Sequence, residues 1–76
     1  MNNIRRKSLT DIKDRIESLK SDLETLLEEE NDYLDNIPEN MQGGERYEKA
    51  ENAVSSLENA VSSLEEAMDD IESATE

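Results

Sequence analysis

Two runs of apolar residues, spaced alternately three and four positions apart, constrain this chain more than any other feature. That spacing is typical of the seam along which one α-helix packs against another in a coiled coil. The first run comprises Leu9, Ile12, Ile16, Leu19, Leu23 and Leu26, and the same count continues through Glu30, Tyr33 and Ile37. The second run comprises Tyr47, Ala50, Val54, Leu57, Val61, Leu64, Met68 and Ile71. The pattern predicts an all-α fold with two long helices.

The ends of these helices are marked by ordinary signals. Ser8, with Asp11 three residues later, is a candidate N-cap, so residues 1–8 are expected to form a basic arm and residues 9–36 the first helix. Pro38 disfavours helical backbone at the residue before it, and two glycines follow in the connector, residues 37–44. The second helix is expected over residues 45–75, in a single domain.

A connector this short favours an antiparallel coiled-coil hairpin. In the register that it implies, Ile12 faces Met68, Ile16 faces Leu64, Leu23 faces Leu57, and Tyr33 approaches Tyr47. Charge agrees with this direction, because the first 20 residues carry six basic and three acidic side chains. A hairpin places the basic ones beside the acidic end of the second helix. They are Arg5, Arg6, Lys7, Lys13 and Arg15, opposite Glu65, Glu66, Asp69, Asp70, Glu72 and Glu76.

The second helix contains an internal repeat, in which ENAVSSL occurs at residues 51–57 and again at 58–64. Ala53, Ala60 and Ala67 recur every seven residues, which either permits close approach of another helix or reflects the high helix propensity of alanine. With Leu27 and Leu34 they widen the apolar stripe. Because a lone hairpin of this size buries little surface, we expect these five residues to mediate dimerisation into a four-helix bundle. The alternative is a monomer that becomes ordered on its target.

Composition argues against catalysis. The chain has no cysteine, no histidine and no glycine-rich phosphate loop, so we expect no enzyme, no cofactor and no metal site. The net charge of −13 opposes direct binding to nucleic acid or anionic membranes and favours a protein with a basic surface. No apolar stretch approaches the length of a membrane span, so a cytoplasmic location is expected.

Acidic residues are concentrated where the hairpin turns, with only Arg46 and Lys49 among them. They are Glu28, Glu29, Glu30, Asp32, Asp35, Glu39, Glu45, Glu48 and Glu51. Negative charges along a rigid rod can imitate a phosphate backbone and occupy the basic groove of a nucleic-acid-binding protein. The alternative is a solvated face that confers solubility.

The connector sequence NIPENMQGGERYE, together with the Ala-Val-Ser-Ser-Leu-Glu heptads, resembles a class of short acidic proteins from phages and bacterial mobile elements. The resemblance spans about residues 9–74 and implies a phage-like origin and a bacterial host. Small acidic phage proteins include inhibitors of host defence, such as anti-CRISPR proteins that mimic DNA. We therefore expect an inhibitor of a host protein, acting through the acidic loop end. The alternative is a structural or adaptor coiled coil that works by helix self-association.

Overall fold

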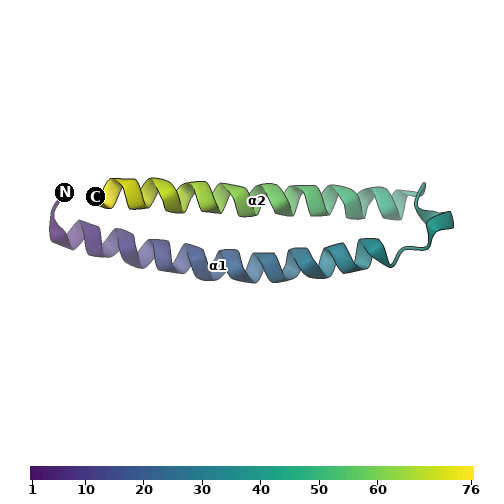
Figure 1. Cartoon of the computed structure of the whole chain (residues 1–76), viewed down its shortest axis with the longest axis horizontal. Coiled ribbons are helices and arrows are strands. Elements are labelled where there is room, and N and C mark those ends of the chain that lie inside the picture. Colours follow the sequence, from purple (N-terminus) through teal and green to yellow (C-terminus); the bar gives the residue numbers. More distant parts are fainter.

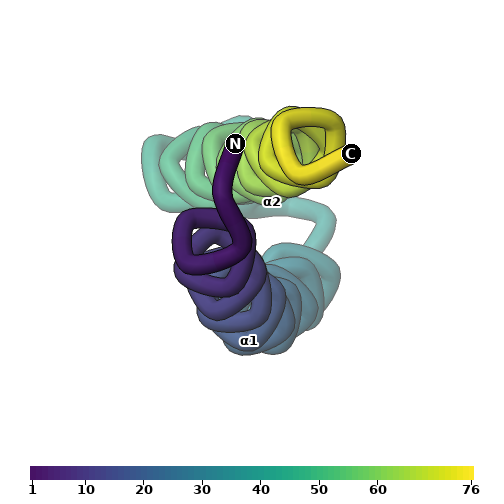
Figure 2. Tube along the Cα trace, turned by 90° about the vertical axis from the view of Figure 1, so that its left-hand side faces the viewer, coloured from purple at the N-terminus to yellow at the C-terminus, as the bar shows by residue number.

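The computed structural model describes all 76 residues as two long helices lying side by side. The first, α1, spans Asn3–Asp35, and the second, α2, spans Glu45–Thr75. They run antiparallel, and both termini lie at the end opposite the connector (Figure 1). Seen end-on, the helices cross at a shallow angle rather than lying strictly parallel (Figure 2). The predicted all-α antiparallel hairpin is confirmed, whereas a second copy is not part of the structure.

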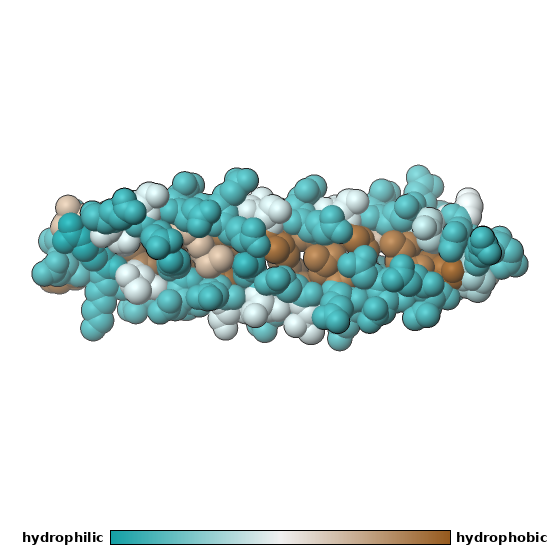
Figure 3. All heavy atoms as spheres, in the orientation of Figure 1, coloured by the Kyte–Doolittle hydropathy of each residue, from teal (hydrophilic) through white to brown (hydrophobic).

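The molecule is a rod of 59 × 15 × 13 Å with a radius of gyration of 17.3 Å. A compact domain of this length would have a radius of gyration of about 11 Å. Apolar side chains follow the line where the two helices meet, and polar ones cover the rest of the visible face (Figure 3). Because a pair of helices encloses so little volume, only Ile37, Ala50 and Val54 are buried. All three belong to the part of the chain near the turn.

The start of α1 differs from the prediction. The helix begins at Asn3 and not near residue 9, and the Asn2 side chain caps it by accepting a hydrogen bond from the Arg5 backbone N–H at 2.8 Å. Asparagine is among the best N-cap residues, so Asn2 competes successfully with Ser8. The residues expected to form a basic arm are therefore almost entirely helical.

The connector is ordered by a short turn that begins at Pro38. A 3-10 helix, η1, spans Glu39–Met41, and the Met41 N–H donates to the Pro38 carbonyl at 2.8 Å. Gly44 occupies the N-cap position of α2, and no residue in the chain has a positive φ. A Cβ on Gly44 would lie 3.3 Å from the Met41 carbonyl oxygen, so a larger residue there would require the turn to shift by a few tenths of an ångström.

Candidate binding surfaces

Besides Ile4 near its start, four large apolar side chains on α1 remain exposed on the folded hairpin. Leu19 and Leu26 retain 62% and 56% of their accessible surface, and Ile12 and Tyr33 retain 38% and 40%. They recur every seven residues and so lie along one side of the helix, which we call the outer stripe (Ile12, Leu19, Leu26 and Tyr33). By contrast, no large apolar residue of α2 is exposed.

This placement corrects the predicted seam. Ile12, Leu19 and Leu26 were expected to face α2, and that expectation is wrong. The half-buried row of α1 keeps Leu9, Ile16, Leu23 and Glu30 of the predicted seam, but it has Lys13, Lys20, Leu27 and Leu34 in place of Ile12, Leu19, Leu26 and Tyr33. We call this row the inner stripe, and it ends at the buried Ile37. The pairing of Ile12 with Met68 stays a prediction.

Two lysines occupy that inner stripe and join it to α2 through ion pairs. The amine of Lys13 lies 3.3 Å from Glu72, and that of Lys20 lies 3.1 Å from Glu65 and 3.8 Å from Glu24. A long aliphatic stem lets lysine cover apolar surface while its charge stays in water. The hydrogen bond that the Lys20 amine donates to Glu65 raises the pKa of that amine above its ordinary value, with smaller electrostatic contributions from the neighbouring carboxylates.

The residues predicted to mediate self-association are partly covered within the single chain. Leu27, Leu34, Ala53, Ala60 and Ala67 are all half-buried, because they lie at or beside the seam between the two helices. Their role in dimerisation stays a prediction. The apolar surface that is still free on the hairpin lies mainly on the outer stripe.

Tyr33 at the end of the outer stripe is held by α2. The Arg46 side chain donates a hydrogen bond from Nε to the Tyr33 hydroxyl, and its guanidinium carbon lies 5.1 Å from the centre of the ring. At this separation the guanidinium is also attracted to the π-face of the ring. Tyr33 thus contacts Arg46 next to the predicted neighbour Tyr47, and its polar end is satisfied while part of the ring stays exposed.

The acidic residues predicted to bind a partner gather at the hairpin tip. The structure places them over the end of α1, η1 and the start of α2 (Figure 1). Only Glu45 forms an ion pair, with Lys49 in the same helix at 3.1 Å. Glu28, Glu29, Glu30, Asp32, Asp35, Glu39, Glu48 and Glu51 form none, and this group with Glu45 is called the acidic tip. Binding through these residues stays a prediction.

The opposite end of the hairpin is less neutralised than predicted. Lys13 forms the expected kind of contact, but Arg5, Arg6, Lys7 and Arg15 form no ion pair with α2. The unpaired cations of α1 consequently lie in its first half, where the carboxylates of Asp11, Asp14 and Glu17 also form no ion pair. Its last 15 residues carry acidic side chains and no basic one.

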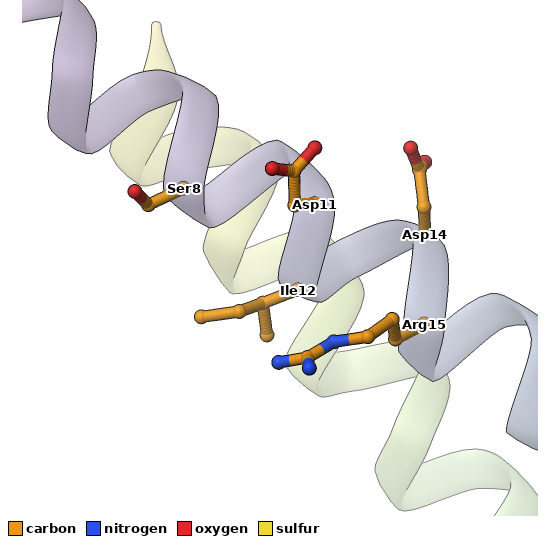
Figure 4. A pocket seen from close by; sticks show the side chains of 5 residues that line it. All are labelled: Ser8, Asp11, Ile12, Asp14 and Arg15. Carbon is orange, nitrogen blue, oxygen red and sulfur yellow. The ribbon is translucent and has the colours of Figure 1, made fainter.

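A single shallow depression marks the surface, and one helix supplies its whole lining of Ser8, Asp11, Ile12, Asp14 and Arg15. Ile12 and Arg15 extend from the same side of α1, whereas Asp11 and Asp14 point to another side (Figure 4). A catalytic pocket needs polar groups that converge from several elements, and this site lacks them. No group of side chains has an arrangement that could hold a metal ion, and neither helix is long and apolar enough to span a bilayer.

Sequence reasoning missed the outer stripe because two adjacent stripes of α1 fit the same spacing. Residues 12, 19, 26 and 33 are all apolar, whereas residues 13, 20, 27 and 34 include two lysines. The signal that could have separated them is the match of Lys13 and Lys20 to Glu72 and Glu65 on the opposite helix. Comparison with known proteins finds no matching family model and no similar curated protein or solved structure, so the resemblance to phage proteins stays a prediction.

Proposed function

We propose that this chain is a non-enzymatic binding module that docks on another protein helix through the outer stripe of α1. The observation that carries the proposal is the exposure of Ile12, Leu19, Leu26 and Tyr33 at strict heptad spacing. Exposed apolar residues scattered singly need no explanation, but a continuous row along a helix is the surface used in helix-to-helix recognition. Each heptad offers one side chain to insert between residues of a partner helix.

The rigidity of the hairpin supports this role. Helix α2 holds α1 along its whole length, so the stripe is presented in helical form before any partner arrives (Figure 1). An isolated helix would have to be ordered on binding, at an entropic cost that lowers affinity. Here α1 is already ordered by its packing against α2, so binding need not order it.

The test compares two double variants that add the same charge. Leu19→Glu with Leu26→Glu places two carboxylates on the outer stripe. Ser56→Glu with Ser63→Glu places two at heptad spacing on the exposed side of α2. Proteins captured from a bacterial lysate by the wild type should be lost with the first variant and retained with the second. Equal capture by all three forms would contradict the proposal, once circular dichroism shows equal helicity.

A second candidate function is favoured by the acidic tip. In that case the chain inhibits a nucleic-acid-binding protein of a host cell, in the manner of a DNA mimic, and is of phage origin. The supporting observation is that eight of the nine tip carboxylates have no cationic partner within the chain. Such unpaired charge would attract a basic groove at long range.

Salt dependence separates the two candidates. Binding through the tip should weaken steeply as ionic strength rises, because salt screens exposed charges. Reversal to lysine of Glu28, Glu29, Glu30 and Asp32 should abolish it while helicity is preserved. Binding through the outer stripe should survive both changes and fail only with Leu19→Glu and Leu26→Glu. At 0.5 M salt the Debye length is about 4 Å, so exposed charges are strongly screened. Capture that is unaffected by charge reversal and by this salt concentration would exclude the acidic tip as the binding surface.

A further inference from the structure

The exposed apolar residues of the outer stripe are evenly spaced about one point. Leu19 and Leu26 lie equally far before and after the middle of residues 22 and 23, and so do Ile12 and Tyr33. A two-fold interface needs this property, because each residue on one copy must meet its counterpart on the other. The even spacing of the row therefore permits pairing with a second copy.

The charges of α1 are also divided at this midpoint, because all its basic side chains precede the midpoint and only acidic ones follow it. The unpaired cations Arg5, Arg6, Lys7 and Arg15 precede the midpoint, and the unpaired carboxylates of Glu28, Glu29, Glu30, Asp32 and Asp35 follow it. If two copies of α1 lie antiparallel, the basic half of each runs beside the acidic half of the other. A parallel arrangement would instead place carboxylates beside carboxylates.

Resting on the function proposed above, we infer that the partner of the outer stripe is a second copy of this chain, bound antiparallel. In this dimer Leu19 packs against Leu26 of the second copy and Ile12 packs against Tyr33 of the second copy. The result is a four-helix assembly in which the two α1 helices form the contact.

Arg15 supplies a specific electrostatic contact across this interface. Its side chain extends from the same side of α1 as Ile12, so it flanks the outer stripe (Figure 4). Glu29 occupies the equivalent heptad position on that flank, two heptads later. In the antiparallel dimer Arg15 of each copy lies beside Glu29 of the other, and symmetry produces the contact twice. Neither side chain has a partner in the single hairpin.

Mass in solution is the first test. Sedimentation equilibrium of the wild type should give twice the chain mass of 8.7 kDa at high protein concentration. Leu19→Glu with Leu26→Glu should give 8.7 kDa over the same range, and Ser56→Glu with Ser63→Glu should behave as the wild type. A wild type that stays monomeric at millimolar concentration would overturn self-pairing. The capture comparison above would still decide whether the stripe binds another protein.

The relative direction of the two α1 helices is tested by disulfide trapping. The chain has no native cysteine that would interfere. Leu19→Cys chains mixed with Leu26→Cys chains should form a mixed disulfide on mild oxidation, because the antiparallel dimer makes these positions neighbours. Each variant alone should cross-link poorly, since like positions are offset along the helix axis by about 10 Å, beyond the reach of a disulfide. Efficient cross-linking of Leu19→Cys with itself, without the mixed product, would overturn the antiparallel arrangement.

Charge exchange tests the pairing of Arg15 with Glu29. Arg15→Glu alone and Glu29→Arg alone should each weaken dimerisation by about tenfold, because two attractive contacts become repulsive. Both changes in one chain should restore the wild-type constant, since the contact re-forms with its charges exchanged. If the double variant is weaker than either single one, these residues do not meet and the proposed register is wrong.

Discussion

The amine of Lys20 lies 3.1 Å from a carboxylate oxygen of Glu65, and this ion pair joins the two helices near their middle. One heptad earlier along α1, Lys13 makes the same contact with Glu72. Lysine at these positions lets α1 turn its inner stripe toward α2 without burying a charge. Leu19 and its equivalents are thereby left on the outside of the hairpin.

Replacement of Lys20 by glutamine should lower the melting temperature more than replacement of Lys49. The Lys20 pair spans two helices, whereas Lys49 pairs with Glu45 in its own helix and both of these side chains are highly exposed. Thermal unfolding followed by circular dichroism at low and high salt measures the difference. The gap between Lys20→Gln and Lys49→Gln should narrow at high salt. A larger effect at Lys49 would show that the cross-helix pair does not stabilise the hairpin.

The same lysine predicts a pH dependence. Glu65 raises the pKa of Lys20 above its ordinary value of 10.5 in the folded state. A raised folded pKa stabilises the protein fully below the ordinary pKa, and the stabilisation is lost as pH rises through the folded pKa. The stability difference between the wild type and Lys20→Gln should therefore be constant from pH 7 to about 10 and should close above that range. If the stability difference disappeared near neutral pH instead, it would arise from titrating groups other than Lys20.

Truncation to alanine should destabilise the hairpin much more at Leu23 than at Leu26. Leu23 is half-buried on the inner stripe, and Leu26 is 56% exposed on the outer stripe. Leu23→Ala should lower the free energy of unfolding by about 1–2 kcal/mol, because its contacts with α2 are lost. Leu26→Ala should change it by less than about 0.5 kcal/mol. Denaturant unfolding at protein concentrations too low for association measures the stability of the single hairpin. Similar losses at both positions would restore the seam expected from the sequence, which contains Leu23 and Leu26 alike.

Ile37 should be the most sensitive apolar position of the connector. It is 3% exposed, and its N–H donates to the Leu34 carbonyl at 3.2 Å. Ile37→Ala should cost on the order of 2 kcal/mol or more, since burial at the turn is lost and a void remains. Ile4→Ala, at a 79% exposed isoleucine, serves as the matched control and should cost almost nothing. Similar costs at both positions would show that the turn is not packed as described.

The end of α1 should tolerate charge reversal with a gain in stability. Its last turn contains Asp32 and Asp35 and no basic residue, which is unfavourable beside the negative end of the helix dipole. Asp35→Lys should raise the free energy of unfolding by about 0.3–1 kcal/mol at low salt, and the gain should fall as salt is added. A loss of stability would indicate that Asp35 has a structural partner in solution.

The fold follows from the sequence to a large extent, because its main determinants are local. The 3, 4 spacing, Pro38 and the connector length predict two antiparallel helices, and the structure has both, with α2 at the predicted residues 45–75. The sequence alone could not decide whether α1 begins after Asn2 or after Ser8, since both are good N-cap residues. The face that α1 turns toward α2 depends on long-range pairing of Lys13 and Lys20 with α2. Apolar periodicity alone therefore placed Leu9, Ile16 and Leu23 correctly and selected Ile12, Leu19 and Leu26 where the structure turns Lys13, Lys20 and Leu27 toward α2.

The position of the two chain ends has a practical consequence. Both ends lie together, and the turn that carries most of the unpaired carboxylates lies at the other extreme of a rod 59 Å long (Figure 1). In a single hairpin, a fluorophore, purification tag or surface linkage on either terminus therefore stays remote from the turn. An immobilised monomer would stand with its turn facing the solvent, which makes the single hairpin suited to surface-based binding measurements in which the acidic tip is the accessible part.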